Sequence, residues 1–298
     1  FTIMNLDDYE ESFVPDTADL TLADRWILDR LNRTIEDVSR NLDKFELGAA
    51  ADNIYNFAWN YFCDWYIELA KNRLYGPHNK DRQVTQYVLV HTLTRMLALL
   101  HPFMPFITEH LWQHLPHTGD NLARSSWPVQ EKEYDFAVEE EQMERIMDAI
   151  KAIRNMRAGS NVAPNRMCHV QIAFTRDDLV SAVTEHKEYF EKLAHVEEIK
   201  VLDKNSAKPE NAVASVVTGM EVYMELKGLV DVEKERARVL KAQEALNKDI
   251  KRSSGKLNNQ GFLAKAPAAV VEKEKAKLAE MEKQMKSLNE RLEFLAKL

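Results

Sequence analysis

An aromatic run within residues 59–66 contains side chains of the types that bind nucleic acid. Its rings are Trp59, Tyr61, Phe62, Trp65 and Tyr66. Aromatic rings can stack on unpaired bases, and Lys71 and Arg73, which follow closely, could bind phosphates. At helical spacing such rings usually form a core, and we expect this for Tyr61 and Trp65. The run covers several helix faces, so other rings should lie at an exposed edge. The alternative for the rings and for the two cations, at even odds, is a solvated helix end.

The charge of the chain is distributed unevenly. Between Glu233 and Lys297 there are 16 Lys and Arg against 10 Asp and Glu, a net charge of +6, whereas the remainder carries −14. The total of −8 argues against a generally basic nucleic-acid binder. A basic tail on an acidic body predicts that the tail meets a polyanion, with an ordinary solvated coiled coil as an equal alternative.

Motifs for catalysis and metal binding are missing from the sequence. It has no glycine-rich phosphate loop, no nucleophile elbow and no convincing Ser/His/Asp set, so we predict no catalytic residue. His110 and His114 have metal-ligand spacing but no third ligand, so we predict no metal site. Cys63 and Cys168 form no CxxC pair and predict two buried thiols in a reducing compartment. No membrane span or signal peptide is recognisable, which favours the cytoplasm, and a start at Phe1 favours a fragment or a processed product.

Hydrophobic periodicity predicts a helix bundle for residues 1–158. The helices are expected at about 22–43, 46–74, 81–100, 105–115 and 136–157. Thr21 and Asp24 resemble a capping box, and Pro105 suits the first turn of a helix. The short connections between the first four helices predict antiparallel neighbours.

Residues 159–228 predict a small α/β junction module. Alternating apolar residues indicate a strand at 168–174, a helix follows at about 178–194, and short strands are expected at 199–202 and 212–217. Gly219 then turns the chain into a further alternating run, which predicts a β-hairpin.

Residues 229–298 predict an antiparallel two-helix coiled coil, so the chain as a whole should be mainly α. Residues recur by seven in two interleaved series on each limb. These are Val232, Val239, Leu246 and Ser253 with Gln243, Ile250 and Leu257, then Val271, Leu278, Met285 and Leu292 with Met281, Leu288 and Leu295. Gly261 and Pro267 supply the reversal between the limbs. Each limb of nearly 30 residues should reach about 40 Å.

Several motifs together resemble the valyl-tRNA synthetase family of class I aminoacyl-tRNA synthetases. Those of its anticodon-binding domain are matched by Leu22–Trp26, Phe62–Glu68 and His101–Glu109. Those at the tip of its C-terminal arm are matched by Lys256–Phe262, Lys265–Pro267 and Val270–Glu272. Isoleucyl enzymes often end in a cysteine-rich zinc module, which the two isolated cysteines of this chain cannot form. Leucyl enzymes lack the long arm, so both features favour the valyl family. An isoleucyl or leucyl relative and a coiled-coil scaffold for a protein partner are the alternatives.

The resemblance implies the tRNA-recognition part of a ligase that attaches valine to tRNA(Val). The full enzyme would use ATP with Mg, whereas this fragment would hold no cofactor. The implied partners are tRNA(Val) and the catalytic and editing domains of the same chain, whose motifs are missing here, and a monomer is expected. Phe1 would lie inside the first bundle segment of the family.

The resemblance also implies two groups of tRNA contacts. The anticodon would be met by Phe1 and Ile67, with weaker expectations for Asp64, Lys71 and Arg73. The outer corner of the L-shaped tRNA would be met by Arg252 and Lys277, with Lys251 and Lys256 beside them. Lys277 stands where an arginine is expected, so it keeps the charge but loses the bidentate fork.

Overall fold

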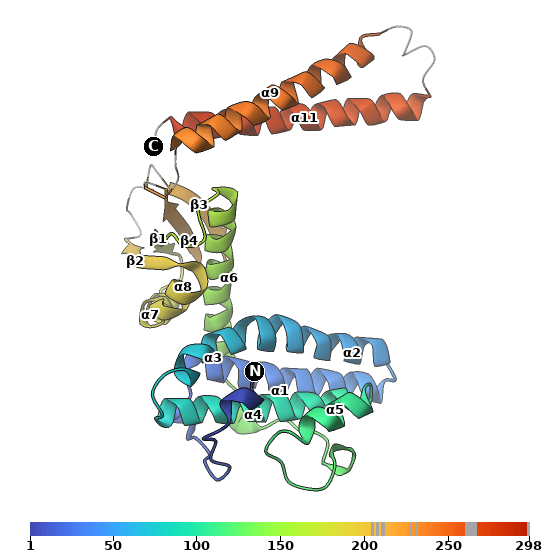
Figure 1. Cartoon of the computed structure of the whole chain (residues 1–298), viewed down its shortest axis with the longest axis vertical. Helices are drawn as coiled ribbons and strands as arrows, with labels where there is room; N and C mark the ends of the chain where they lie inside the picture. The colour runs from blue at the N-terminus through green and yellow to red at the C-terminus, as the bar shows by residue number, and fades with distance from the viewer. Residues whose placement is uncertain are drawn as a thin grey trace. The chain divides into compact units, whose positions relative to one another are not determined.

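The computed structural model describes residues 1–203, 206, 209, 212–226, 228–229, 232–259 and 267–296. The chain divides into two compact units, Phe1–Met147 and Asp148–Leu298. Helices dominate both, with one four-stranded sheet in the second unit, so the expected mainly α fold is confirmed (Figure 1). Among the described residues, every helix is too short or too polar to cross a membrane. The finer division at residues 158 and 228 remains a proposal.

The first unit is a helix bundle whose helices begin where local sequence signals place them. It contains α1 (Leu22–Asp43), α2 (Leu47–Asn56), α3 (Ile67–Leu74), α4 (Lys80–Leu100), α5 (Pro105–Trp112) and the start of α6 (Ala137–Gly159). The Thr21 hydroxyl accepts from the Asp24 N–H at 3.3 Å, while the Asp24 carboxylate accepts from the Thr21 N–H at 3.0 Å, which confirms the capping box. Pro105 occupies the first turn of α5, which ends sooner than the expected Leu115.

A π-helix, η3 (Phe57–Tyr66), lies where one long α-helix was expected, between α2 and α3. Its wider turn rotates the chain relative to an α-helix and brings both Phe62 and Tyr66 into the core beside Trp65. Tyr61, expected in the core, is only half-buried. Its ring packs edge-on to Trp26, with centroids 6.1 Å apart, and carries the Arg30 guanidinium 4.5 Å above it.

The second unit contains a mixed sheet of β1 (Cys168–Phe174), β2 (Val196–Leu202), β3 (Ala212–Val217) and β4 (Met220–Glu225). Its strand order is β2-β1-β4-β3, with β1 and β2 parallel and the other pairs antiparallel. The expected helix at 178–194 is instead two helices, α7 (Asp178–Glu185) and α8 (Lys187–Ala194). They form the crossover that a parallel pair requires. The expected hairpin is present, and Gly219 adopts a φ of 88° at its turn.

The arm consists of α9 (Val232–Leu257) and α11 (Ala268–Leu295), which pack along each other (Figure 1). Among the described side chains, those at the predicted coiled-coil positions are buried or half-buried. The 26 residues of α9 span about 39 Å at the rise of an α-helix. The reversal predicted at Gly261 lies outside the described residues.

Candidate nucleic-acid interface

The N-terminal residue of the chain lies on the C-terminal end of α3 and forms an aromatic surface with a cation beside it. The ring of Phe1 is edge-on to that of Tyr75, with centroids 6.4 Å apart, and Lys71 Nζ lies 6.0 Å from the Phe1 centroid. Asn5 Nδ2 donates to the Phe1 carbonyl oxygen at 2.9 Å and holds the residue in place. Phe1 is 38% exposed and Tyr75 69% exposed, so both rings are accessible. We call Phe1, Ile67, Lys71 and Tyr75 the N-terminal corner.

Two predicted residues join this corner, and a third lies close to it in sequence. Ile67 is half-buried, one helical turn before Lys71 and therefore on the same face of α3. Lys71 pairs with Glu68 and keeps part of its surface exposed. Asp64 is exposed near the end of η3. The sequence prediction missed Tyr75, whose available signal was an aromatic residue immediately before the helix-ending Gly76-Pro77.

Arg73 has a structural role that the sequence prediction did not anticipate. Its guanidinium donates to both carboxylate oxygens of the buried Asp24, which also accepts from Tyr66 Oη at 2.7 Å. Burial alone would raise the pKa of Asp24, but the charge of Arg73 and these hydrogen bonds hold it below its usual value. Arg73 therefore stabilises the bundle, and its expected role at the anticodon remains a prediction.

An exposed aromatic pair lies where α2 continues into the π-helix η3, with Tyr55 on α2 and Trp59 on η3. The Tyr55 and Trp59 rings are 6.4 Å apart and tilted by 50°, and both are more than half exposed. The expectation that some rings of the run lie at an edge is confirmed for Trp59. Tyr55 was missed, although its position four residues before Trp59 places both rings on one helix face. Trp65, by contrast, is buried as expected.

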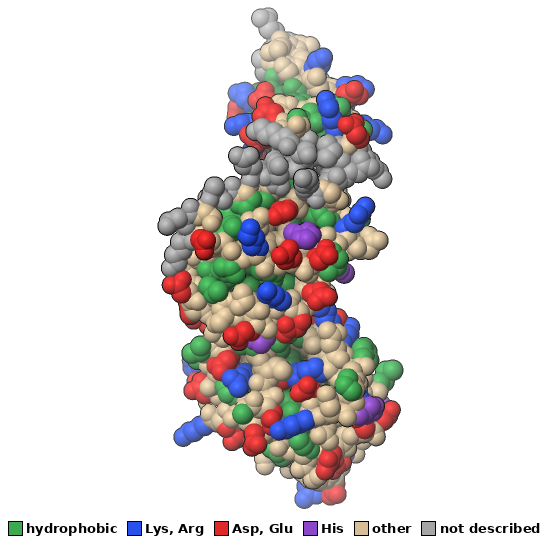
Figure 2. Space-filling model, turned by 90° about the vertical axis from the view of Figure 1, so that its left-hand side faces the viewer, with side chains coloured by type: hydrophobic (Ala, Val, Ile, Leu, Met, Phe, Trp, Pro, Cys, Tyr) green, Lys and Arg blue, Asp and Glu red, His purple; other side chains and the backbone are tan. Residues whose placement is uncertain are grey.

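The four cations predicted for the arm differ in their exposure and in their pairing with carboxylates. Arg252 is 74% exposed on its side chain and lies 3.5 Å from Asp249, and Lys251 and Lys277 are also exposed. Lys256 instead donates to Glu274 at 3.3 Å. On the face shown in Figure 2, basic and acidic side chains are interspersed over the arm, so its basic character is a net excess. Arg252, Lys251 and Lys277 are thus more available to a polyanion than Lys256.

A residue that the sequence prediction missed is Glu274, which lies in the seam of the arm. The series Met281, Leu288 and Leu295, extended back by seven residues, reaches Glu274. Its side chain is only 16% exposed and accepts from Ser253 Oγ at 2.9 Å. The heptad spacing could therefore have predicted the position of Glu274 in the seam. It was missed because a charged residue is not expected at a core position.

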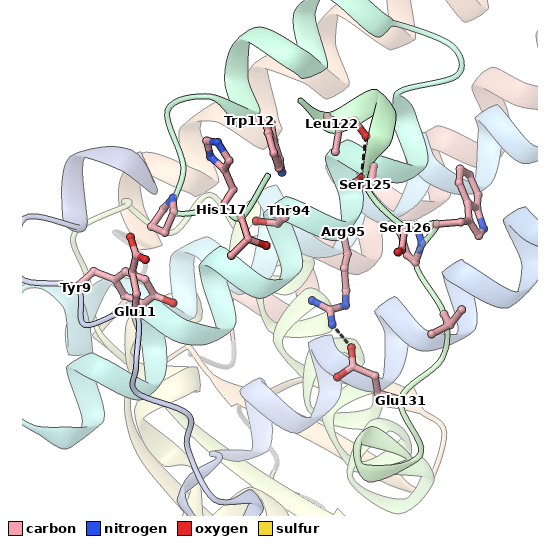
Figure 3. Close-up of a pocket in the computed structure, with 16 residues that line it drawn as sticks. Tyr9, Glu11, Thr94, Arg95, Trp112, His117, Leu122, Ser125, Ser126 and Glu131 are labelled. Carbon is pink, nitrogen blue, oxygen red and sulfur yellow. Dashed lines mark hydrogen bonds and ion pairs between the residues drawn. The ribbon is translucent and has the colours of Figure 1, made fainter. Parts of the chain in front are cut away.

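A hollow of about 530 Å³ lies on the bundle between α4, α5 and residues 116–131 (Figure 3). The rings of Trp112 and His117 lie against each other at its wall, with centroids 3.7 Å apart and planes tilted by 33°. Its cation, Arg95, pairs with Glu131, and Glu11 adds a further carboxylate. Because its charges are internally paired or negative, this hollow is unsuited to binding a phosphate.

The histidines and cysteines show no arrangement for metal binding in the described part of the chain. The His110 and His114 rings lie 4.8 Å apart, and His114 Nδ1 is 2.8 Å from the His110 carbonyl oxygen. Cys168 is buried, whereas Cys63, expected to be buried, is half-buried. Desolvation raises the pKa of both thiols, which disfavours the reactive thiolate at neutral pH.

Two family models match separate parts of the chain. Residues 24–172 match the anticodon-binding domain of tRNA ligases, and residues 231–296 match the valyl-tRNA synthetase tRNA-binding arm. The N-terminal corner apart from Phe1, the Tyr55–Trp59 pair and the arm cations all lie in these regions.

Curated relatives match the chain over nearly its whole length. A valine–tRNA ligase from Bacillus cereus is 39% identical over 297 residues, covering 100% of this chain and 34% of that protein. One from Oceanobacillus iheyensis is 40% identical, covering 93% and 31%. One from Clostridium acetobutylicum is 42% identical, covering 99% and 33%. The chain thus spans about a third of the length of these relatives.

Proposed function

Because this chain belongs to the valyl-tRNA synthetase family and contains its anticodon-binding domain and tRNA-binding arm, we propose that it is the part of a valine–tRNA ligase that recognises tRNA(Val). The observation that carries the proposal is the agreement of two independent family matches, one over residues 24–172 and one over residues 231–296. The bundle would bind the anticodon loop, and the arm would bind the outer corner of the tRNA.

The N-terminal corner has the chemistry that an anticodon loop requires. Unpaired bases in such a loop can be splayed out and stacked on aromatic rings. Phe1 and Tyr75 offer accessible rings, Ile67 offers an apolar surface beside them, and Lys71 can bind a phosphate. Asp64 repels phosphates, so its proposed role is to accept a hydrogen bond from a base amino group. The Tyr55–Trp59 pair is a second stacking surface on the bundle.

The arm provides charge rather than stacking surfaces. Arg252 and Lys277, with Lys251 beside them, carry exposed cations that can bind the tRNA backbone. Contacts at the outer corner would orient the acceptor end of the tRNA toward a catalytic domain, which is a positioning contribution. Lys256 contributes less directly because Glu274 already accepts from it.

The activity of the whole protein is also part of the proposal. Valine would be attached to tRNA(Val) with ATP and Mg by catalytic and editing domains of the kind that make up the rest of a valine–tRNA ligase. We propose that the protein acts as a monomer in the cytoplasm. The interaction partners of this chain would then be tRNA(Val) and those two domains.

Binding of fluorescently labelled tRNA(Val) to the chain, titrated with salt, tests the proposal. We expect the double variant Arg252→Ala/Lys277→Ala to bind about tenfold more weakly. The slope of the logarithm of its association constant against the logarithm of the salt concentration should be smaller in magnitude by about one to two. Lys241→Ala/Lys283→Ala, which removes one exposed cation from each arm helix elsewhere, is the matched control and should change affinity little.

Three outcomes would contradict the proposal. A coiled-coil scaffold would not bind tRNA at all. Equal competition by tRNA(Ile) would argue against valine specificity. A double variant that binds as tightly as the control variant would exclude the assigned role of the arm cations.

A further inference from the structure

Among the described residues, the seam of the arm has polar side chains at positions where its heptad pattern calls for apolar ones. One is Gln243, whose Nε2 donates to Asn289 Oδ1 at 2.6 Å, and the other two lie together nearer the far end of α9. Ser253 and Glu274 both occupy coiled-coil core positions, and Ser253 is buried. Ser253 Oγ donates to Glu274 Oε1 at 2.9 Å, and Lys256 Nζ donates to the same oxygen at 3.3 Å. We call Ser253, Lys256 and Glu274 the polar layer.

The polar layer stabilises the arm no more than apolar side chains in the same positions would. A carboxylate removed from water must be paired and hydrogen-bonded, and an apolar residue in the same place is often equally stable or more stable. The hydrogen bond from Ser253 and the charges of Lys256 and Lys277 lower the pKa of Glu274, so the group is ionised at neutral pH. A polar group in a coiled-coil core instead specifies which residues pair across the seam, because any slipped alignment leaves it without partners.

The position of the layer along the arm connects it to tRNA binding. Lys251 and Arg252 immediately precede Ser253, and Lys256 belongs to the layer itself. Lys277 follows Glu274 by one helical turn, and its charge acts on that carboxylate. All four cations assigned to the tRNA corner therefore lie within one turn of Ser253 or Glu274.

From this coincidence we infer that Glu274 is a positioning residue, which with Ser253 and Lys256 fixes the alignment of α9 against α11 so that Arg252 and Lys277 face the tRNA together. The inference rests on the proposed function of the arm. A slip of one heptad would restore most apolar contacts. It would, however, shift the two cations relative to each other by about 10 Å along the arm, because seven residues rise 1.5 Å each.

The alignment can be measured directly by pulsed electron paramagnetic resonance. Spin labels at Ala242→Cys and Ala279→Cys, both exposed, would report the distance between the helices in a Cys63→Ser background, since Cys168 is buried. We expect one distance in the parent chain. Glu274→Leu and Glu274→Gln should each add a second distance, displaced in the manner of a heptad slip.

Binding and thermal unfolding separate positioning from stability. We expect tRNA(Val) to bind about fivefold more weakly to Glu274→Leu, which corresponds to the loss of roughly one contact. This variant should unfold at the same temperature as the parent chain or at a higher one. Glu282→Gln, which removes an exposed negative charge from the same helix, should keep one distance and bind at least as tightly as the parent chain.

A single unchanged distance in both Glu274 variants would overturn the inference, as would unchanged tRNA affinity in Glu274→Leu. Failure of the proposed function has a different signature. In that case the parent chain would not bind tRNA through Arg252 and Lys277, whereas the distance measurement would still decide whether Glu274 sets the alignment.

Discussion

Arg73 donates to both carboxylate oxygens of Asp24, with Nη1–Oδ2 at 2.8 Å and Nη2–Oδ1 at 2.5 Å. The pair joins α3 to the first turn of α1. Asp24 is completely buried, so the guanidinium is the cation that compensates its charge. The same carboxylate completes the cap of α1 through Thr21. One buried acid thus links helix initiation to the packing of the bundle.

Replacement of Arg73 should therefore destabilise the bundle. Arg73→Ala leaves the buried Asp24 charge uncompensated, and we expect a loss of about 3 kcal/mol in the free energy of unfolding. All five tryptophans lie in the first unit, so tryptophan fluorescence in a urea titration reports on the bundle alone. Arg40→Ala, an exposed cation of α1, should cost less than about 0.5 kcal/mol. Equal effects of the two variants would refute the structural role of Arg73.

His91 should make the bundle sensitive to mild acid. Burial and the charge of Arg95 lower the pKa of His91 to about 3, from an ordinary value of 6.5. Between these values the unfolded chain binds a proton that the folded chain excludes, so stability falls as pH falls from 6.5 toward 3. At the steepest point, the free energy of unfolding should fall by about 1.4 kcal/mol for each unit by which the pH falls.

The measurement is the urea midpoint by tryptophan fluorescence between pH 7 and 5, where Asp and Glu remain mostly ionised. In His91→Gln the urea midpoint should depend less on pH, because the glutamine amide does not titrate. An equally steep loss of stability in the variant would assign the effect to other groups.

Phe1 should contribute to tRNA binding through its ring. Stacking of a base on an aromatic side chain is worth about 1–3 kcal/mol, so Phe1→Ala should weaken binding of tRNA(Val) by roughly five- to a hundredfold. The salt dependence should not change, because no charge is removed. Phe106→Ala, which removes a ring exposed on α5, is the control. Binding that depends equally on both rings would indicate a nonspecific apolar contribution.

Gly219 should be essential to the hairpin of the second unit. Its φ of 88° strains any other residue, and an added Cβ would meet Leu179 Cδ1 at 2.6 Å. We expect Gly219→Ala to destabilise the sheet by about 2–4 kcal/mol from strain and overpacking together. Gly228→Ala, at a φ of 75° with nothing within 4 Å of its Cβ, isolates the strain at about 1–2 kcal/mol.

Hydrogen exchange of the amides in β3 and β4 provides the readout for both glycine variants. Protection should fall more in Gly219→Ala than in Gly228→Ala. Equal losses would show that the contact with Leu179 is relieved without cost.

Local features of this protein could be predicted from its sequence because neighbouring residues determine them. The cap at Thr21 depends on a residue three positions away, and the turn at Gly219 depends on a φ that glycine adopts without strain. The seven-residue spacing in the arm predicted that α9 and α11 pair along their length, because this pairing buries the apolar side chains of both helices. Motif resemblance then indicated the family and the two tRNA-binding regions.

Pairings between distant residues were decided only by the tertiary structure. Arg73 and Lys71 are similar cations two residues apart, yet only Arg73 reaches Asp24, which is 49 residues away in sequence. The π-helix that buries Phe62 and Tyr66 leaves Tyr61 at the edge, because its wider turns change which faces meet the core. The role of Glu274 likewise depends on which residue of α9 lies opposite. Spacing along a chain defines a helix face, but only packing defines what that face meets.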